Sequence, residues 1–224
     1  MGDDGPGRRP HRRGPARRLT RRPRGRTYSR FVLTVIPFRA EGKSRLPEDL
    51  RREVALAMLG DVVEVALAVG EVRVVTDDPA GRLVAGDLGA RLVDDPGSGQ
   101  GDAIAAGLDG ASGICLVVNA DLPRVRASDL NALAVPALLG RLGIVEAHDG
   151  TTNALGLPRA EIFAPLYGPG SAARFRDHAA ALGIDVEALA LGNLVDDVDT
   201  LSDLVRFGPR AGARTAELVE AIAL

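Results

Sequence analysis

Short apolar runs alternate with helical patterns along this chain, and this alternation constrains its fold more than any other feature. Apolar, β-branched segments typical of strands occur at 31–37, 72–76, 91–93 and 114–119. Helical patterns separate them, at 47–70, at 79–88 and from about residue 102. Strands that are apolar on both faces must be covered on both sides, so the pattern predicts a mostly parallel sheet between two layers of helices.

The second half of the chain is less regular but contains the same two kinds of element. Further strands are expected at 143–147, 153–157 and near 184–189. Helices are expected to begin near Ser171 and to follow Thr200 and Thr215. No internal repeat or obvious linker interrupts this order, so residues 30–224 are predicted to form one α/β domain.

The first 29 residues differ from the rest of the chain in charge and composition. Residues 1–29 contain ten arginines and two aspartates, a formal net charge of +8 that leaves −10 on the remainder. This segment cannot bury enough apolar surface to offset the entropy of ordering, so we expect a disordered, arginine-rich tail. Binding of nucleic acid by the tail is disfavoured, because no aromatic residue interleaves with the arginines for base stacking.

Several classes of protein are disfavoured by what the sequence lacks. No stretch approaches the roughly 18 to 20 apolar residues of a membrane helix, so we expect a soluble, cytoplasmic protein. A single cysteine, Cys115, excludes an internal disulfide framework. The three histidines are scattered without the spacing of a zinc site. The loop at 97–102 lacks the third glycine of a dinucleotide-binding fingerprint, which argues against a dehydrogenase.

Three cations follow the first expected strand. Arg39, Lys43 and Arg45 lie within seven residues, and Lys43 is the only lysine of the chain. Ligands of parallel α/β sheets bind beyond the carboxyl ends of the strands, so this loop is well placed to hold a polyphosphate. It is not a Walker A loop, whose glycine and lysine spacing is absent.

Two acidic segments suggest a magnesium site. Asp121 follows the fourth strand, where one carboxylate could hold Mg²⁺ together with waters and substrate phosphates. Asp196, Asp197 and Asp199 place three carboxylates within four residues, which repel one another unless a cation or hydrogen-bond donors compensate them. Either segment alone could instead cap a helix, but together they predict a site for a divalent cation.

Glycine-rich segments near the middle of the second half offer a third candidate site. Gly168 and Gly170 precede Ser171 at an expected helix N-terminus, with Arg174 one turn further on. That arrangement suits a small phosphate or carboxylate, although turn chemistry with a serine N-cap would give the same pattern.

Four of these segments, in this order, resemble the 2-phospholactate/phosphoenolpyruvate guanylyltransferases of coenzyme F420 biosynthesis. They are IPFRAEGKSRL after the first strand, NADLP after the fourth, then GPGSAARF and DDVDTLSDL. The resemblance extends from about Phe31 to Leu204. It implies the nucleotidyltransferase fold, a glycosyltransferase-A-like α/β sandwich with a mostly parallel central sheet.

The resemblance also implies which residues bind the nucleotide, the metal and the acceptor. The basic loop of Arg39, Lys43 and Arg45 would hold the triphosphate of GTP, and Asp121 and Asp197, with Asp199, would hold Mg²⁺. The phosphorylated three-carbon acid would bind at Asn153, Gly168 and Ser171. The family commonly has threonine where this chain has Asn153, and glycine where it has Asn119.

The implied reaction is transfer of GMP from GTP to phosphoenolpyruvate, with release of pyrophosphate and formation of enolpyruvyl-diphospho-guanosine. The same reaction on 2-phospho-L-lactate is the alternative. Residue usage suggests a GC-rich genome, and actinobacterial members of the family use phosphoenolpyruvate, which favours that acceptor. A separate transferase would use the product, no membrane is involved, and a homodimer is left open.

Three other functions compete with this interpretation. One is another nucleotidyltransferase, of molybdenum-cofactor or sugar-nucleotide synthesis, whose members usually carry a LAGG-type loop where this chain has IPFRAEG. Another is nucleic-acid binding through the arginine-rich tail. The last is a catalytically inactive regulatory relative, which the presence of Lys43, Asp121 and Asp197 disfavours.

Overall fold

The structure of the protein is a computed structural model that describes residues 1–2, 32–40, 46 and 48–222. The tail predicted for residues 1–29 lies outside the described residues, apart from its first two. Lys43 and Arg45 of the expected basic loop lie outside them as well. Of that loop's three cations, Arg39 is therefore the one whose position is described.

A seven-stranded sheet forms the centre of the described fold, in the order β3-β2-β1-β4-β6-β5-β7. The strands are β1 (Val32–Pro37), β2 (Glu71–Val75), β3 (Arg91–Val93), β4 (Ile114–Val118), β5 (Leu142–Glu146), β6 (Thr152–Leu157) and β7 (Val186–Ala188). Neighbouring strands run parallel except at β6, which is antiparallel to both β4 and β5. The prediction of a mostly parallel sheet is confirmed.

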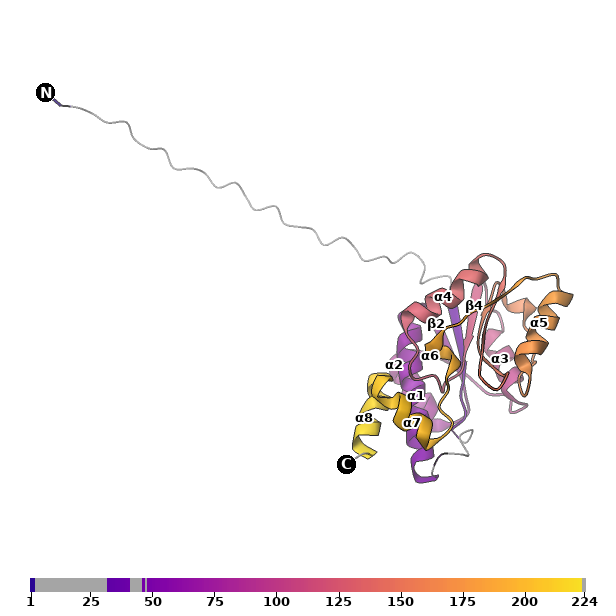
Figure 1. Ribbon diagram of the computed structural model, residues 1–224, viewed down its shortest axis with the longest axis horizontal. Coiled ribbons are helices and arrows are strands. Elements are labelled where there is room, and N and C mark those ends of the chain that lie inside the picture. Colours follow the sequence, from indigo (N-terminus) through magenta and orange to yellow (C-terminus); the bar gives the residue numbers. More distant parts are fainter. Residues whose placement is uncertain (3–31, 41–45, 47, 223–224) are drawn as a thin grey trace.

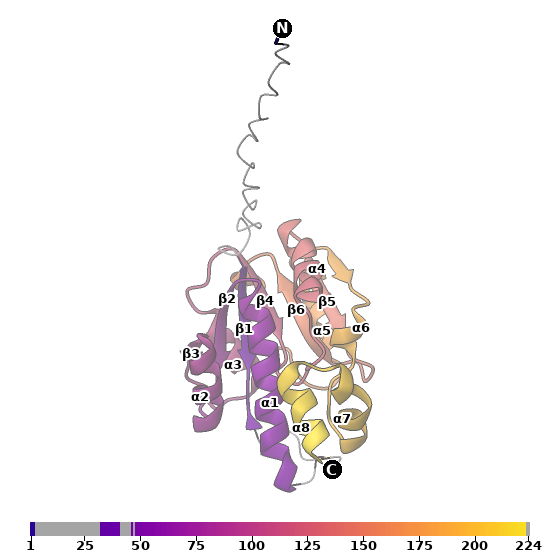
Figure 2. The ribbon, with the colours of Figure 1, turned by 90° about the vertical axis from the view of Figure 1, so that its left-hand side faces the viewer.

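Helices cover both faces of this sheet (Figures 1 and 2). They are α1 (Glu48–Leu67), α2 (Pro79–Leu88), α3 (Gln100–Leu108), α4 (Ala127–Leu138), α5 (Ser171–Ala181), α6 (Gly192–Val195), α7 (Leu201–Phe207) and α8 (Ala213–Ile222). Helices α1, α2 and α4 pack on one face, and α3 and α5 pack on the other. The predicted α/β sandwich is confirmed.

Alternation along the buried strands fills the two interfaces between sheet and helices. In β4, Leu116 and Val118 belong to the core beneath α1 and α4, whereas Cys115 and Val117 belong to the core beneath α3 and α5. All five β4 residues are buried, because successive side chains of a strand point to opposite faces and both faces are covered. Cys115 is one of these core residues, and burial raises the pKa of its thiol to about 11.

Helix α4 packs unusually closely on β6. A Cβ atom added at Gly156 would lie 2.3 Å from the carbonyl oxygen of Leu133 in α4, a distance that real Cβ contacts do not reach. The missing side chain at this position therefore allows the backbone of the strand to approach the backbone of the helix. Gly156 therefore matters for the packing of α4 on the antiparallel strand β6.

The C-terminal helix α8 is held by the first helix. The carboxylate of Asp61 in α1 is buried and accepts hydrogen bonds from the backbone N–H groups of Arg214 and Thr215, each at 3.0 Å. These donors belong to the first turn of α8, where N–H groups have no partner within the helix. Just before α8, Gly212 N donates to Pro123 O at 2.8 Å, which ties the same region to the loop after β4.

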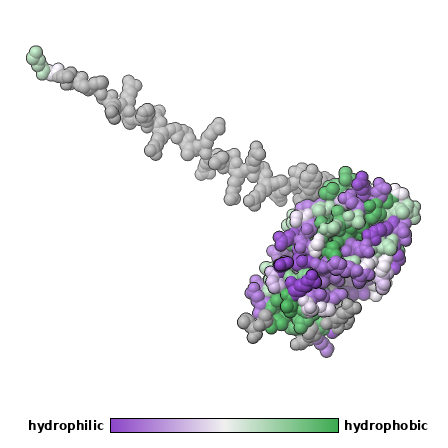
Figure 3. Space-filling model, viewed as in Figure 1, coloured by the Kyte–Doolittle hydropathy of each residue, from purple (hydrophilic) through white to green (hydrophobic). Residues whose placement is uncertain are grey.

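The described surface mixes polar and apolar residues. In Figure 3, hydrophilic residues cross the middle of this face and apolar residues gather toward its upper and lower ends. Exposed apolar side chains include Val135, Leu138 and Leu139 at the end of α4, and Val205 in α7. Exposed apolar residues are common on monomers, so the homodimer stays a prediction. None of the described helices is long and apolar enough to span a bilayer.

Candidate active site

A cavity of about 310 Å³ opens at the carboxyl edge of the parallel strands. Its walls come from the end of β1, helix α1, the loop after β3, the start of α3, the turn after β4 and the segment between α6 and α7. The lining residues are Pro37, Phe38, Arg39, Ala55, Met58, Asp95, Gln100, Ala103, Asn119, Ala120, Asp121 and Asp199. A larger hollow of about 650 Å³ shares Phe38, Arg39 and Asp95 with it and extends over the ends of β2 and β3. The site therefore lies where ligands of parallel α/β sheets bind.

Three carboxylates meet beside this cavity, and two of them, Asp121 and Asp199, line it. One oxygen each of Asp121, Asp197 and Asp199 lies within 4.8 Å of the others, and all three residues are half-buried. Asp121 follows β4, whereas Asp197 and Asp199 lie between α6 and α7. The sequence correctly predicted that these two distant segments come together.

The core dictates this arrangement of the second segment. Val198 is fully buried among Met58, Leu204 and Phe207, and its N–H donates to Asp121 O at 3.1 Å. Side chains of an extended segment alternate in direction, so burying Val198 turns Asp197 and Asp199 away from that core. The same backbone bond holds their segment beside Asp121.

The donor set suits a hard divalent cation. Carboxylate oxygens are the ligands that Mg²⁺ prefers, with waters and substrate phosphates completing its shell. Three clustered carboxylates also repel one another, which a bound cation would relieve. The residues present therefore fit the metal that the resemblance implies, and their role as its ligands stays a proposal.

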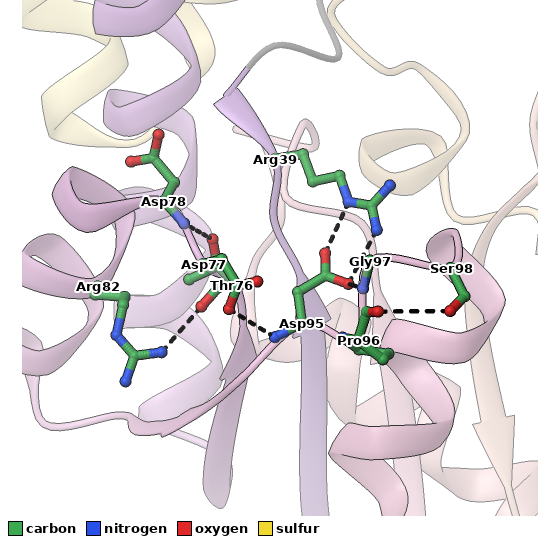
Figure 4. Close-up of polar contacts among 9 residues, drawn as sticks. All are labelled: Arg39, Thr76, Asp77, Asp78, Arg82, Asp95, Pro96, Gly97 and Ser98. Atoms are coloured by element: carbon green, nitrogen blue, oxygen red, sulfur yellow. Dashed lines mark hydrogen bonds and ion pairs between the residues drawn. The ribbon is translucent and has the colours of Figure 1, made fainter.

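Arg39 forms an ion pair at the mouth of the cavity (Figure 4). Its Nε donates to Asp95 Oδ2 at 2.7 Å and its Nη2 donates to Asp95 Oδ1 at 2.9 Å. Asp95 is held in turn, because its N–H donates to Asp77 Oδ1 and its Oδ1 accepts from Gly97 N. The hydrogen bond from Arg39 holds the pKa of Asp95 below its ordinary value, and Asp95 raises the pKa of Arg39.

Removing this guanidinium should be visible in the titration of its partner. In Arg39→Ala we expect the pKa of Asp95 to rise toward its ordinary value of 3.8, measured by ¹³C NMR of the carboxyl carbon. Because the pKa of Asp95 is lower in the folded state, its carboxylate stabilises the fold at pH values above the unfolded-state pKa. This stabilisation is lost as the pH falls through the folded-state pKa. Arg39→Ala should therefore lose the part of the free energy of unfolding that depends on ionisation of Asp95.

A neighbouring ion pair supplies the control for this titration. Arg82 donates to Asp94 at 2.8 Å, so Arg82→Ala removes a similar cation from the adjacent carboxylate. It should leave the pKa of Asp95 where it is. An unchanged pKa of Asp95 in Arg39→Ala would contradict the conclusion that Arg39 lowers that pKa.

The predicted acceptor residues lie on β6 and at the start of α5. Ser171 is fully buried, and its hydroxyl lies 3.0 Å from the hydroxyl of Thr152. Gly168 has a φ of 112°, in the region that favours glycine. Arg174, expected from the sequence to meet an anion, instead donates to the carbonyls of Leu166, Tyr167 and Pro169 and so braces this loop.

Asn153 is buried, and its amide already has protein partners. Its Nδ2 donates to the carbonyls of Leu194 and Val195 at 3.0 and 3.1 Å. Asn119 Nδ2 donates to Asn153 Oδ1 at 3.4 Å, and Gln100 Nε2 donates to Asn119 Oδ1 at 2.8 Å. Sequence reasoning gave Gln100 no role, and the only signal available was its place at a helix start beyond a strand.

Arg124 was also missed, although it follows the NADLP segment directly. Its guanidinium donates to Gly192 O and to the carboxylate of Asp196, and it lies 4.4 Å over the ring of Phe207. His148 Nε2 lies 2.9 Å from the other oxygen of Asp196. Asp196 is thus engaged by Arg124 and His148, while Asp197 and Asp199 form the cluster with Asp121.

The domain with this sheet, carboxylate cluster and cavity is a nucleotidyltransferase domain. The family model of the MobA-like NTP transferase domain matches residues 53–181. A nucleotide-diphospho-sugar transferase of Desulfovibrio desulfuricans has the same fold, with a TM-score of 0.70 at 16% identity over 87% of this chain and 96% of that one.

Sequence relatives narrow this class. The phosphoenolpyruvate guanylyltransferase of Streptomyces scabiei is 35% identical over 214 residues, which cover 84% of this chain and 96% of the relative. That of Thermomonospora curvata is 36% identical over 207 residues, covering 84% and 89%. The chain belongs to the phosphoenolpyruvate guanylyltransferase family, as the resemblance drawn from its motifs implied.

Proposed function

We propose that this enzyme transfers GMP from GTP to phosphoenolpyruvate. The observation that carries the proposal is the cluster of Asp121, Asp197 and Asp199 beside a cavity at the carboxyl edge of the sheet. The name shared by its sequence relatives supports the nucleotide and the acceptor. The products would be pyrophosphate and enolpyruvyl-diphospho-guanosine.

The chemistry requires positioning more than acid–base catalysis. A phosphate oxygen of the acceptor attacks the α-phosphorus of GTP, and the bond from that phosphorus to the bridging oxygen of the β-phosphate breaks. The attacking phosphate is already an anion, so no side chain has to remove a proton from it. A divalent cation held by Asp121, Asp197 and Asp199 would supply neutralisation of phosphate charge.

The remaining residues would orient the two substrates. Arg39 would meet the triphosphate together with Lys43 and Arg45, which requires exchange of its partner Asp95 for a phosphate. Gly168 and Ser171 would border the acceptor at the start of α5, where backbone N–H groups favour an anion. Alignment of the acceptor with GTP would account for most of the rate enhancement.

2-Phospho-L-lactate is the alternative acceptor. It differs from phosphoenolpyruvate only in having a saturated, chiral carbon in place of the enol double bond, so it presents the same phosphate and carboxylate. We further propose that the enzyme acts in the cytoplasm, in coenzyme F420 biosynthesis, where a separate transferase consumes the diphosphate-linked product.

Pyrophosphate release tests the proposal directly. The full-length protein is incubated with GTP, Mg²⁺ and either phosphoenolpyruvate or 2-phospho-L-lactate, with ATP and CTP as nucleotide controls. We expect release that requires GTP and phosphoenolpyruvate and stops when Mg²⁺ is chelated. Release with 2-phospho-L-lactate alone would reassign the acceptor. No release with either acid, from folded protein, would refute the proposal and favour sugar phosphates or the molybdenum cofactor.

A further inference from the structure

A row of side-chain amides leads from the wall of the cavity into the fold. Gln100, Asn119 and Asn153 follow one another in hydrogen-bond contact, from the start of α3 to β6. Asn119 and Asn153 face each other across the antiparallel pair of β4 and β6, since Asn119 N donates to Asn153 O at 3.1 Å. Residues opposite each other in such a pair share a face of the sheet, which brings their amides together.

Asn153 connects this row to the short helix α6. Leu194 and Val195, whose carbonyls accept from its Nδ2, are the last two residues of that helix. The final carbonyls of a helix have no donor within it, so they need partners from elsewhere. Asn153 is only 1% exposed and supplies both donors, so it caps the C-terminal end of α6 from inside the fold.

The segment that leaves this capped end carries the carboxylates. Asp197 lies two residues beyond Val195, and Val198 N then bonds to Asp121 O. The end of α6 is therefore a second support for Asp197 and Asp199, beside the burial of Val198 and its backbone bond to Asp121. A shift of that helix end would move two of the three members of the cluster.

Hydrogen bonds on both sides fix which way the amide of Asn153 faces. The oxygen and nitrogen ends of an amide have nearly the same shape, so hydrogen bonds decide its orientation. The carbonyls of Leu194 and Val195 can only accept, so they require its Nδ2, and Asn119 supports this orientation by donating to its Oδ1. Both protons of Asn153 are then committed, and neither is left for the carboxylate or phosphate of an acceptor.

We propose that Asn153 is a positioning residue for the metal-binding carboxylates, and that Asn119 and Gln100 support its orientation. The assignment rests on the proposed function, because it requires Asp121, Asp197 and Asp199 to bind a divalent cation. It replaces the direct contact with the acceptor acid expected from the sequence. Side chains that orient metal ligands without touching the metal commonly change metal affinity by 10- to 100-fold when removed.

Binding of Mn²⁺ to the nucleotide-free protein, followed by the electron paramagnetic resonance signal of free Mn²⁺, tests this role. In Asn153→Leu, which keeps the branched shape but removes the donors, we expect the dissociation constant to rise about tenfold. Asn119→Ala leaves Asn153 in place and should raise it about threefold, the effect of one net hydrogen bond. The KM for phosphoenolpyruvate should change less than the dissociation constant of Mn²⁺ in both variants.

Arg73→Met is the matched control. Arg73 is also buried, and it donates to the carbonyls of Gly107 and Asp109 at the C-terminal end of α3, away from the cavity. This variant should lower the melting temperature and leave the Mn²⁺ dissociation constant unchanged. A similar loss of Mn²⁺ binding in the control would attribute the effect to general stability and overturn the proposal.

Two further results would also overturn it. An unchanged Mn²⁺ dissociation constant in Asn153→Leu and Asn119→Ala, with a raised KM for phosphoenolpyruvate, would return Asn153 to the acceptor site. Absence of Mn²⁺ binding in the wild-type protein would refute the metal site of the proposed function itself, and the positioning role with it.

Discussion

Asp197→Asn should lower the rate of pyrophosphate release by about a thousandfold, a loss of about 4 kcal/mol of transition-state stabilisation. The substitution keeps the shape of the side chain but replaces one of three clustered carboxylates by a neutral amide. Asp121→Asn should act in the same way from the other segment of the cluster. The measurement is the initial rate of pyrophosphate release as a function of Mg²⁺ concentration, with GTP and phosphoenolpyruvate saturating.

An exposed aspartate provides the comparison for these variants. Asp87 lies on the solvent side of α2, so Asp87→Asn changes the net charge equally without touching the cluster. It should retain the wild-type rate. The melting temperature of Asp87→Asn should stay near that of the wild type. The melting temperatures of Asp121→Asn and Asp197→Asn should stay near it or rise, because removing one charge reduces repulsion within the cluster. Wild-type rates in Asp197→Asn would rule out the carboxylate cluster as the metal site.

Gly156→Ala should destabilise the fold by about 3 kcal/mol, the upper end of the usual cost of overpacking. The added methyl group would lie 2.3 Å from the carbonyl oxygen of Leu133, and neither backbone can yield without separating α4 from β6. For a domain of this size, that loss lowers the melting temperature by about 10 °C. Thermal unfolding followed by circular dichroism measures it.

Gly86→Ala supplies the contrasting case for this prediction. Gly86 is also inside a regular element, α2, but a Cβ there meets nothing nearer than a side-chain methyl of Leu92 at 3.7 Å. Alanine at an unstrained helical position favours folding, so we expect unchanged or slightly raised stability. Equal melting temperatures for the two variants would contradict the close approach of α4 and β6.

The parallel half of the fold was predictable from local pattern. Its strands are apolar runs, and Asp78 before Pro79 marks the start of α2 through a side chain that accepts from Gly81 N. Helix α4 gave no such signal, because Pro136 interrupts its last turns and its apolar residues run nearly continuously. The direction of β6 is set by pairing with β4 and β5, a long-range property that the sequence of a single six-residue strand does not reveal.

The candidate site also has a part that was predictable from local sequence and a part that depends on long-range pairing. Clustered carboxylates can be recognised in a sequence, because neighbouring negative charges repel one another unless a cation or hydrogen-bond donors compensate them. The prediction that Asp197 lies beside Asp121 followed from this repulsion. The roles of Asn119 and Asn153 depend on an antiparallel pairing that brings the start of β6 to the carboxyl edge of the parallel strands. Asn119 and Asn153, the two positions that the resemblance singled out in the sequence, are thus in direct contact.

The order of the last elements along the chain determines which parts of the fold a partly synthesised chain contains. The final strand of the sheet, β7, ends at Ala188, before Asp197 and Asp199 and before the helix α8 that Asp61 holds. Chains emerge from the ribosome from the N-terminus, and domains fold as their residues become available. A nascent chain can therefore complete the central sheet before two of the three clustered carboxylates have been synthesised.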